Sequence, residues 1–102
     1  MASLVVMYKT PPDPKAFDEH HSQLLIPIAQ RIPGLRRYEI SRGPVMTPDG
    51  ASGYHLVVMM RFDDMAALQQ AFASAEGHAA LADAQNFATA GFDIFMFEDR
   101  EA

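Results

Sequence analysis

The sequence contains no cysteine. This absence excludes disulfides, thiolate nucleophiles and cysteine-ligated zinc or iron–sulfur sites. It also fits a reducing compartment, so we expect a cytoplasmic protein. Long hydrophobic runs are missing too: the N-terminal run LVVM (4–7) has only the length of a strand and lacks the basic lead and cleavage site of a signal peptide. We therefore expect neither a secretion signal nor a membrane partner.

Positive charge is scarce. Eight Lys and Arg residues are scattered among thirteen Asp and Glu residues, and the formal net charge is −5. Because no basic stripe is available to neutralise phosphates, nucleic acid is not an expected partner. The composition, 49% hydrophobic and 21% charged, is typical of a folded chain. At 102 residues we expect one domain, 1–102, which buries less than about 70% of its unfolded surface and so favours a partner.

The first half of the chain predicts a strand followed by a long helix. SLVVMYK (3–9) is rich in β-branched residues and stops at prolines. Asp13 followed by Pro14 is typical of a helix start, and apolar residues recur until PGL (33–35) ends the pattern. We expect a helix over 14–32, with a kink at Pro27.

The second half predicts three further strands, at 35–41, 54–62 and 91–99, with a long loop between the first two. An alanine-rich helical region precedes the last strand and is expected to break at Glu76 and Gly77. The resulting order, β-α-β-β-α-β, predicts an α+β ferredoxin-like sandwich with a four-stranded antiparallel sheet.

Both faces of the predicted sheet are largely apolar. In the strand 54–62, alternate residues place Leu56 and Val58 on one face and Val57 and Met59 on the other. Two helices cover only one face, and an antiparallel face in water should be polar. We therefore expect a second copy to cover the other face, giving a homodimer with an interface on the order of 1,600 Å² or more.

The same alternation predicts that His55 and Arg61 face this dimer interface. An ion pair with a carboxylate such as Glu39 or Asp93 is expected there. Tyr54 is expected on the helix-covered face.

Two segments resemble one known family. VVMYKTPPDPKAFDEHHSQLLIPIAQRIPGLRRYEI (5–40) is similar to the opening of the EthD family, named for a protein of ethyl tert-butyl ether degradation, and RFDDMAALQQAFASAEGHAALADAQNFATAGFDIFMFED (61–99) is similar to its close. The resemblance implies a dimeric α/β barrel, in which two ferredoxin-like sheets pack face to face. It also implies small-molecule metabolism without a cofactor: some members resemble accessory proteins of degradation pathways and others cofactor-free dehydratases of aromatic polyketide pathways.

The resemblance also implies a site on the first helix. Family members of the dehydratase type carry a His, an aromatic residue and a second His shortly before a Pro. These positions fall here on His20, His21, Leu25 and Pro27. Leu25 transfers no proton, so the sequence departs from the family where the second histidine would act.

The two adjacent histidines point in different directions, since successive helical residues lie about 100° apart. His21 falls inside the apolar stripe with Phe17, Leu24 and Ile28, and His20 falls at its border. One interpretation is a histidine at the edge of the core that bonds to backbone or water. The other is a general base or hydrogen-bond donor that lines a cavity.

We take His20 and His21 as catalytic candidates, and Tyr8, Tyr38 and Leu25 as substrate-binding candidates. No metal site is expected, because leucines stand four residues after each histidine.

Three functions remain open. The first is a cofactor-free protein that binds a small apolar or aromatic metabolite between the first helix and the sheet and transfers a proton, as a dehydratase or isomerase does. The second is a non-catalytic dimeric accessory or ligand-carrier protein. The third is a cofactor-free monooxygenase.

Overall fold

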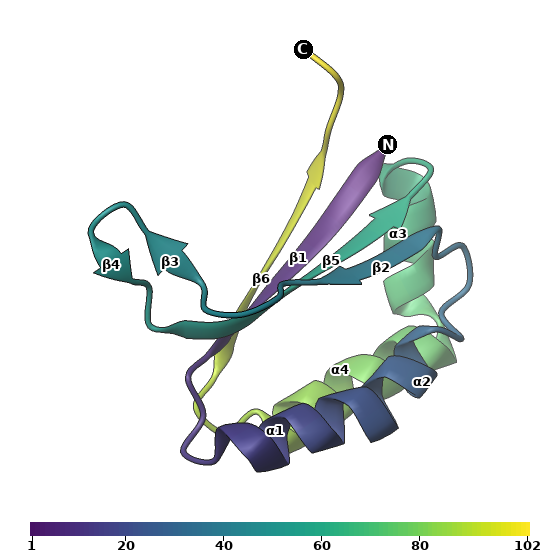
Figure 1. The fold of residues 1–102 in the computed structure, drawn as a ribbon. Coiled ribbons are helices and arrows are strands. Elements are labelled where there is room, and N and C mark those ends of the chain that lie inside the picture. The colour runs from purple at the N-terminus through teal and green to yellow at the C-terminus, as the bar shows by residue number, and fades with distance from the viewer.

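Four strands form one antiparallel sheet in the order β2-β5-β1-β6 (Figure 1). The computed structural model describes residues 1–102. The strands span β1 Ala2–Lys9, β2 Arg37–Ile40, β5 Tyr54–Phe62 and β6 Phe92–Glu98. Helices lie on one face only, so the predicted ferredoxin-like α+β fold is confirmed. No helix has the length and apolar character needed to cross a membrane.

The helical layer consists of α1 Pro14–His20, the π-helical turn η1 His21–Leu25, α2 Ile26–Ala29, α3 Met65–Ala73 and α4 Ala75–Phe87. As predicted, Asp13 caps α1: its carboxylate accepts the backbone N–H of Ala16. The predicted break at Glu76 and Gly77 is wrong. The chain breaks at Ser74, whose hydroxyl accepts the N–H of Gly77 and so starts α4 earlier.

The predicted kink at Pro27 takes the form of a widened turn. Pro27 has no N–H to give to the carbonyl of the preceding turn, and just before it the N–H of Ile26 bonds to the carbonyl of His21, five residues back. A wider turn advances each residue by less than about 100°. Leu24 is consequently 53% exposed, contrary to its predicted place in the buried stripe, and Leu25 is buried.

The central strands β1 and β5 pair in regular register until the last residue of β1. Tyr8 pairs with Leu56, but the next residue, Lys9, pairs with Tyr54, so His55 has no partner on β1. This β-bulge shifts the alternation of side chains by one residue. Tyr54 therefore bonds Asp93 on the open face, and His55 lies on the helix side. The predicted faces of Tyr54 and His55 are wrong for this reason.

The face of the sheet opposite the helices is open and apolar. Phe95 is 55%, Phe97 45% and Met59 39% exposed. No helix lies on this side of the sheet (Figure 1). Arg61 lies on this face as predicted, but its partner is Asp99, at 2.6 Å between Nη2 and Oδ2, rather than Glu39 or Asp93.

The segment predicted as a long loop contains a small hairpin, formed by β3 Met46–Thr47 and β4 Gly50–Ala51. It projects beyond the sheet, away from the helices (Figure 1). We call residues 41–53 the arm.

The core lies between the sheet and the helices. It comprises seventeen buried apolar residues, of which Leu4, Val58, Phe62 and Leu68 are the largest that are fully buried. Burial of each such side chain contributes about 1.5–3 kcal/mol. At the junction of α3 and α4, Gly77 approaches the backbone so closely that an added Cβ would lie 2.7 Å from Cα of Phe72.

We predict that Gly77→Ala destabilises the protein by about 1–3 kcal/mol, because the new methyl group overlaps backbone that cannot move aside. Helix propensity alone predicts the opposite, a gain of about 1 kcal/mol. Ala79, exposed on the same helix, provides the control: Ala79→Gly should cost about 1 kcal/mol. Urea unfolding measures both, and a gain in stability for Gly77→Ala would contradict the close approach.

Candidate functional site

We call α1, η1 and α2 together the first helical segment (14–29). A cavity of about 670 Å³ opens between this segment, the bulged start of β5 and the arm. The helical segment contributes Asp18, His21 and Ile26, and β5 contributes His55 and Leu56. The arm contributes small and apolar residues. The volume suits a small ligand.

His21 lies at the buried side of this cavity. Its side chain is only 3% exposed, as predicted from the helical pattern, and Nε2 is hydrogen-bonded to the hydroxyl of Tyr38 at 3.0 Å. Its ring is parallel to that of Phe17, with centroids 6.4 Å apart. Burial lowers the pKa of His21 below its usual value; the nearby Asp18 opposes this shift and His20 adds to it. His21 is therefore mainly neutral near pH 7.

A second imidazole faces the same cavity. His55 Nε2 donates to Oδ1 of Asp18 at 2.7 Å, and the two side chains are 23% and 59% exposed. The edge of the His55 ring meets the ring of Phe17, with centroids 5.3 Å apart and planes at 89°. The contact fixes His55 between the sheet and α1.

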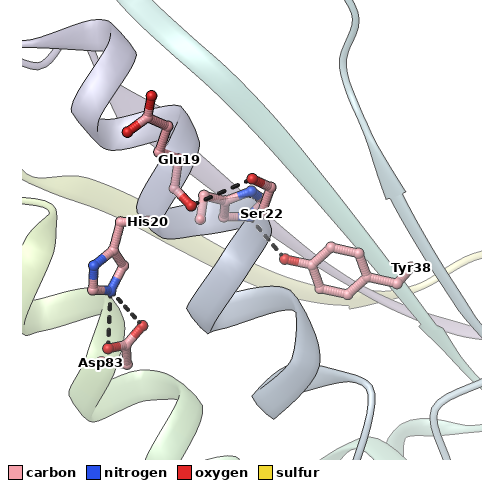
Figure 2. Close-up of polar contacts among 6 residues, drawn as sticks. Glu19, His20, Ser22, Tyr38 and Asp83 are labelled. Atoms are coloured by element: carbon pink, nitrogen blue, oxygen red, sulfur yellow. Dashed lines mark hydrogen bonds and ion pairs between the residues drawn. The ribbon is translucent and has the colours of Figure 1, made fainter.

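His20 points away from the cavity. Its Nε2 donates to both carboxylate oxygens of Asp83 on α4, at 3.1 and 3.0 Å, and its ring stacks on Phe87 at 4.2 Å. Figure 2 shows this pair on one side of the helix, while the hydroxyl of Tyr38 approaches from the other. His20 lines a separate hollow of about 280 Å³. The geometry links His20 to helix packing, and its catalytic role stays a prediction.

The predicted substrate-binding residues are divided between two places. Tyr38 reaches the site through His21, and burial raises the pKa of its hydroxyl above the usual value. Tyr8 is 2% exposed and packs in the core against His21, with ring centroids 6.0 Å apart. Leu25 and Tyr8 line an apolar crevice of about 30 Å³ rather than the large cavity. Nowhere do three or more His, Asp or Glu side chains gather closely enough to hold a metal ion.

Sequence reasoning missed Asp18, His55 and the arm as parts of the site. Asp18 and His55 stand 37 residues apart and meet only because the bulge turns His55 towards α1. The one signal was Gly53, which has a φ of +84° directly before the strand. Glycine next to a strand start is typical of a bulge, but it does not give the direction of the following side chains.

We predict that the buried His21 lowers the free energy of unfolding as the pH falls below neutral. Since burial lowers the pKa of His21, the unfolded chain takes up a proton first as the pH falls through about 6.5, and the free energy of unfolding falls with it. His21→Gln should weaken this pH dependence, measured by urea unfolding between about pH 8 and pH 5. The exposed His78 supplies the control: His78→Gln should keep the wild-type dependence, and an unchanged slope for His21→Gln would contradict the burial of a neutral ring.

Comparison with known proteins gives three similar proteins of nearly the same length. An uncharacterised 11.0 kDa protein from the thcB-thcC intergenic region of Rhodococcus erythropolis is 38% identical over 101 residues, which cover 99% of this chain and 96% of that protein. The crystal structure of an ethyl tert-butyl ether degradation (EthD) family protein from Bacillus halodurans has a TM-score of 0.90 and 36% identity, covering 98% of this chain and 99% of the other.

A more distant structure shares the fold alone. SnoaB, a cofactor-independent oxygenase from Streptomyces nogalater, has a TM-score of 0.69 at 16% identity, covering 99% of this chain and 94% of SnoaB. The EthD domain model matches residues 9–91. This range includes the residues that line the cavity and the three histidines His20, His21 and His55 with their hydrogen-bond partners. From this match and the two relatives above 30% identity, the chain belongs to the EthD family.

Proposed function

We propose that the protein binds a small apolar or aromatic metabolite in the cavity between the first helix and the arm and transfers a proton on it without a cofactor. The observation that carries this proposal is the cavity itself, about 670 Å³, with a buried, neutral imidazole at its inner side. Membership of the EthD family supports a role in small-molecule metabolism.

The walls of the cavity favour an apolar ligand. Ile26, Ile40, Val45, Met46 and Leu56 supply aliphatic surface on three sides. Methionine adapts its shape to flat and irregular ligands, and Met46 is 62% exposed on the arm. Eight polar side chains share the lining, and Asp18, His21 and Ser22 among them lie on the first helical segment. A ligand with an apolar body and a polar end therefore suits the cavity.

The chemistry assigned to His21 is that of a neutral imidazole. Its lowered pKa keeps one ring nitrogen unprotonated at neutral pH, so it can accept a hydrogen bond from a ligand. Tyr38 holds the ring through Nε2 and so fixes its orientation. In this proposal His20 supports the site only by holding α1 against α4, because its Nε2 is already bonded to Asp83.

A non-catalytic ligand carrier is the second candidate. Leu25 stands where the resemblance implies a second histidine, and it packs in the apolar crevice beside Tyr8, where no proton can be exchanged. The oxygenase activity of SnoaB belongs to a protein that shares the fold alone, and nothing in this cavity favours that reaction here.

Thermal unfolding tests the binding. Among phenol, catechol, 2-naphthol and cyclohexanone, we expect at least one to raise the melting temperature by several degrees when present at about ten times its dissociation constant. Ala51→Trp, which places a large ring in the cavity mouth from the exposed strand β4, should abolish the rise.

Ala66→Trp on the exposed side of α3 is the matched control and should keep the rise. If none of the compounds stabilises the wild-type protein, or if Ala51→Trp responds as the wild type does, the cavity is not the binding site.

We further propose that the protein acts as a homodimer in the cytoplasm, with the open faces of two sheets packed together. The protomer is a slab of 35 × 34 × 18 Å. It exposes 6428 Å², against about 5,700 Å² for a monomer of 11.3 kDa. A cluster of exposed Met and Phe side chains on one flat face is typical of an interface between copies.

We predict that Phe95→Glu converts the dimer to a monomer. In an isolated protomer this side chain is 55% exposed and a charge is tolerated, whereas in the paired sheets the carboxylate would be buried without a partner. Leu24 is similarly exposed, at 53%, but lies on the helical layer, so Leu24→Glu should remain dimeric. Sedimentation at micromolar concentration measures the mass; a wild-type species of 11.3 kDa alone would contradict the dimer.

A further inference from the structure

We propose that His55 and Asp18 form the general-base pair of the cavity, with His55 accepting a proton from the bound ligand and Asp18 holding the ring. The inference rests on the proposed function, because it assigns the proton transfer in that cavity to a particular pair. Neither residue stands out in the sequence as a site residue, and the bulge of β5 alone brings them together.

The bulge places His55 by changing its face. Without it, His55 would alternate onto the open face of the sheet with Val57 and Met59. With it, the ring lies on the helix side of the sheet, rests edge-on against Phe17 and lines the cavity together with Asp18 and His21. Bulges are frequently found beside active sites, where they re-aim one side chain.

The hydrogen bond to Asp18 determines which nitrogen is basic. A carboxylate only accepts, so Nε2 of His55 must carry the hydrogen that joins it to Oδ1 at 2.7 Å. In the neutral ring the other nitrogen, Nδ1, then carries a lone pair. Nδ1 makes no hydrogen bond within the chain and is not sealed from solvent. A basic nitrogen is therefore free for a ligand proton.

The other two imidazoles are less available. Nε2 of His21 is bonded to Tyr38, and this ring is 97% buried, since its exposure is 3%. His20 is part of a similar Asp–His pair, but that pair lies outside the cavity. His55, with a side chain 23% exposed, combines an orienting carboxylate with access to the cavity.

Few charges surround the His55 ring. Asp18 and His21 face it from the first helical segment, and Tyr54 precedes it on its own strand. The residues of the arm that line the cavity carry no titratable side chain. Asp18 is therefore the carboxylate beside the ring, and its hydrogen bond holds the ring in place.

The step balances without a cofactor. A ligand with an acidic O–H or C–H bond, such as a phenol or an enolisable ketone, loses its hydrogen to Nδ1 as a proton. The O–H or C–H electron pair stays on the ligand as a phenolate or enolate, and an N–H bond forms on the ring. Return of the proton to a different atom of the ligand completes an isomerisation and regenerates neutral His55.

The coloured phenol 4-nitrophenol is the probe, because only its ionised form is yellow. We expect the wild-type protein to bind it by equilibrium dialysis and, at about pH 6, to raise its ionised fraction several-fold over that in free solution, since the phenolate is held beside the imidazolium. His55→Gln, whose amide can still donate to Asp18, should bind the probe but lose this rise. Asp18→Asn should reduce it.

His78→Gln is the control: it removes an exposed imidazole on α4, outside the cavity, and should leave the ionised fraction at the wild-type level. If His55→Gln ionises the bound probe as fully as the wild type, the proposal is overturned while the binding function stands. If His55→Gln alone loses binding, His55 holds the ligand rather than a proton, and the proposal is again overturned. If the wild-type protein binds no 4-nitrophenol, the proposed function for aromatic ligands fails first.

Discussion

The two apolar faces of the sheet are the constraint on which the rest of the structure depends. One face is covered by the helical layer, which buries Leu4, Val58 and Phe62. The other carries Met59, Phe95 and Phe97 at the surface, and the chain has no further element to cover it. Water in contact with such a face is unfavourable in proportion to its area, which is why we propose that a second copy completes the fold.

The candidate site depends on two departures from regular structure, each with a local cause. Pro27 lacks the N–H of an ordinary helical turn, and a π-helical turn precedes it, in which His21 remains in line with Phe17 while Leu24 turns outward. On the facing strand, the bulge at His55 turns its side chain towards the same helix. π-turns and bulges occur often at functional sites because they change the direction of a few side chains without altering the fold.

Three histidines near the first helical segment are each held by a different partner. Asp83 joins His20 to α4, Tyr38 joins the buried His21 to β2, and Asp18 joins His55 to α1. An imidazole bonded to a carboxylate has a fixed hydrogen position, whereas one bonded to a hydroxyl does not, because a hydroxyl both donates and accepts. The chemistry available to each ring thus follows from what it touches rather than from its residue type.

The sequence by itself determined the order of elements, the fold class, the family resemblance and the burial of His21, because these follow from periodicity and from residues close together in the chain. Periodicity predicted β5 to the residue, and the strands β1, β2 and β6 to within two residues of each end. It placed Leu24 in the core and His55 on the open face, where the structure does not place them.

Only the tertiary structure decided those directions. A single extra residue in a strand or a helical turn changes the direction of the side chains beside it. Whether it forms depends on contacts with distant segments: β1 for the bulge, and α4 for the helix. The cavity, which requires the arm, the bulge and the first helical segment together, has no counterpart in any one stretch of sequence for the same reason.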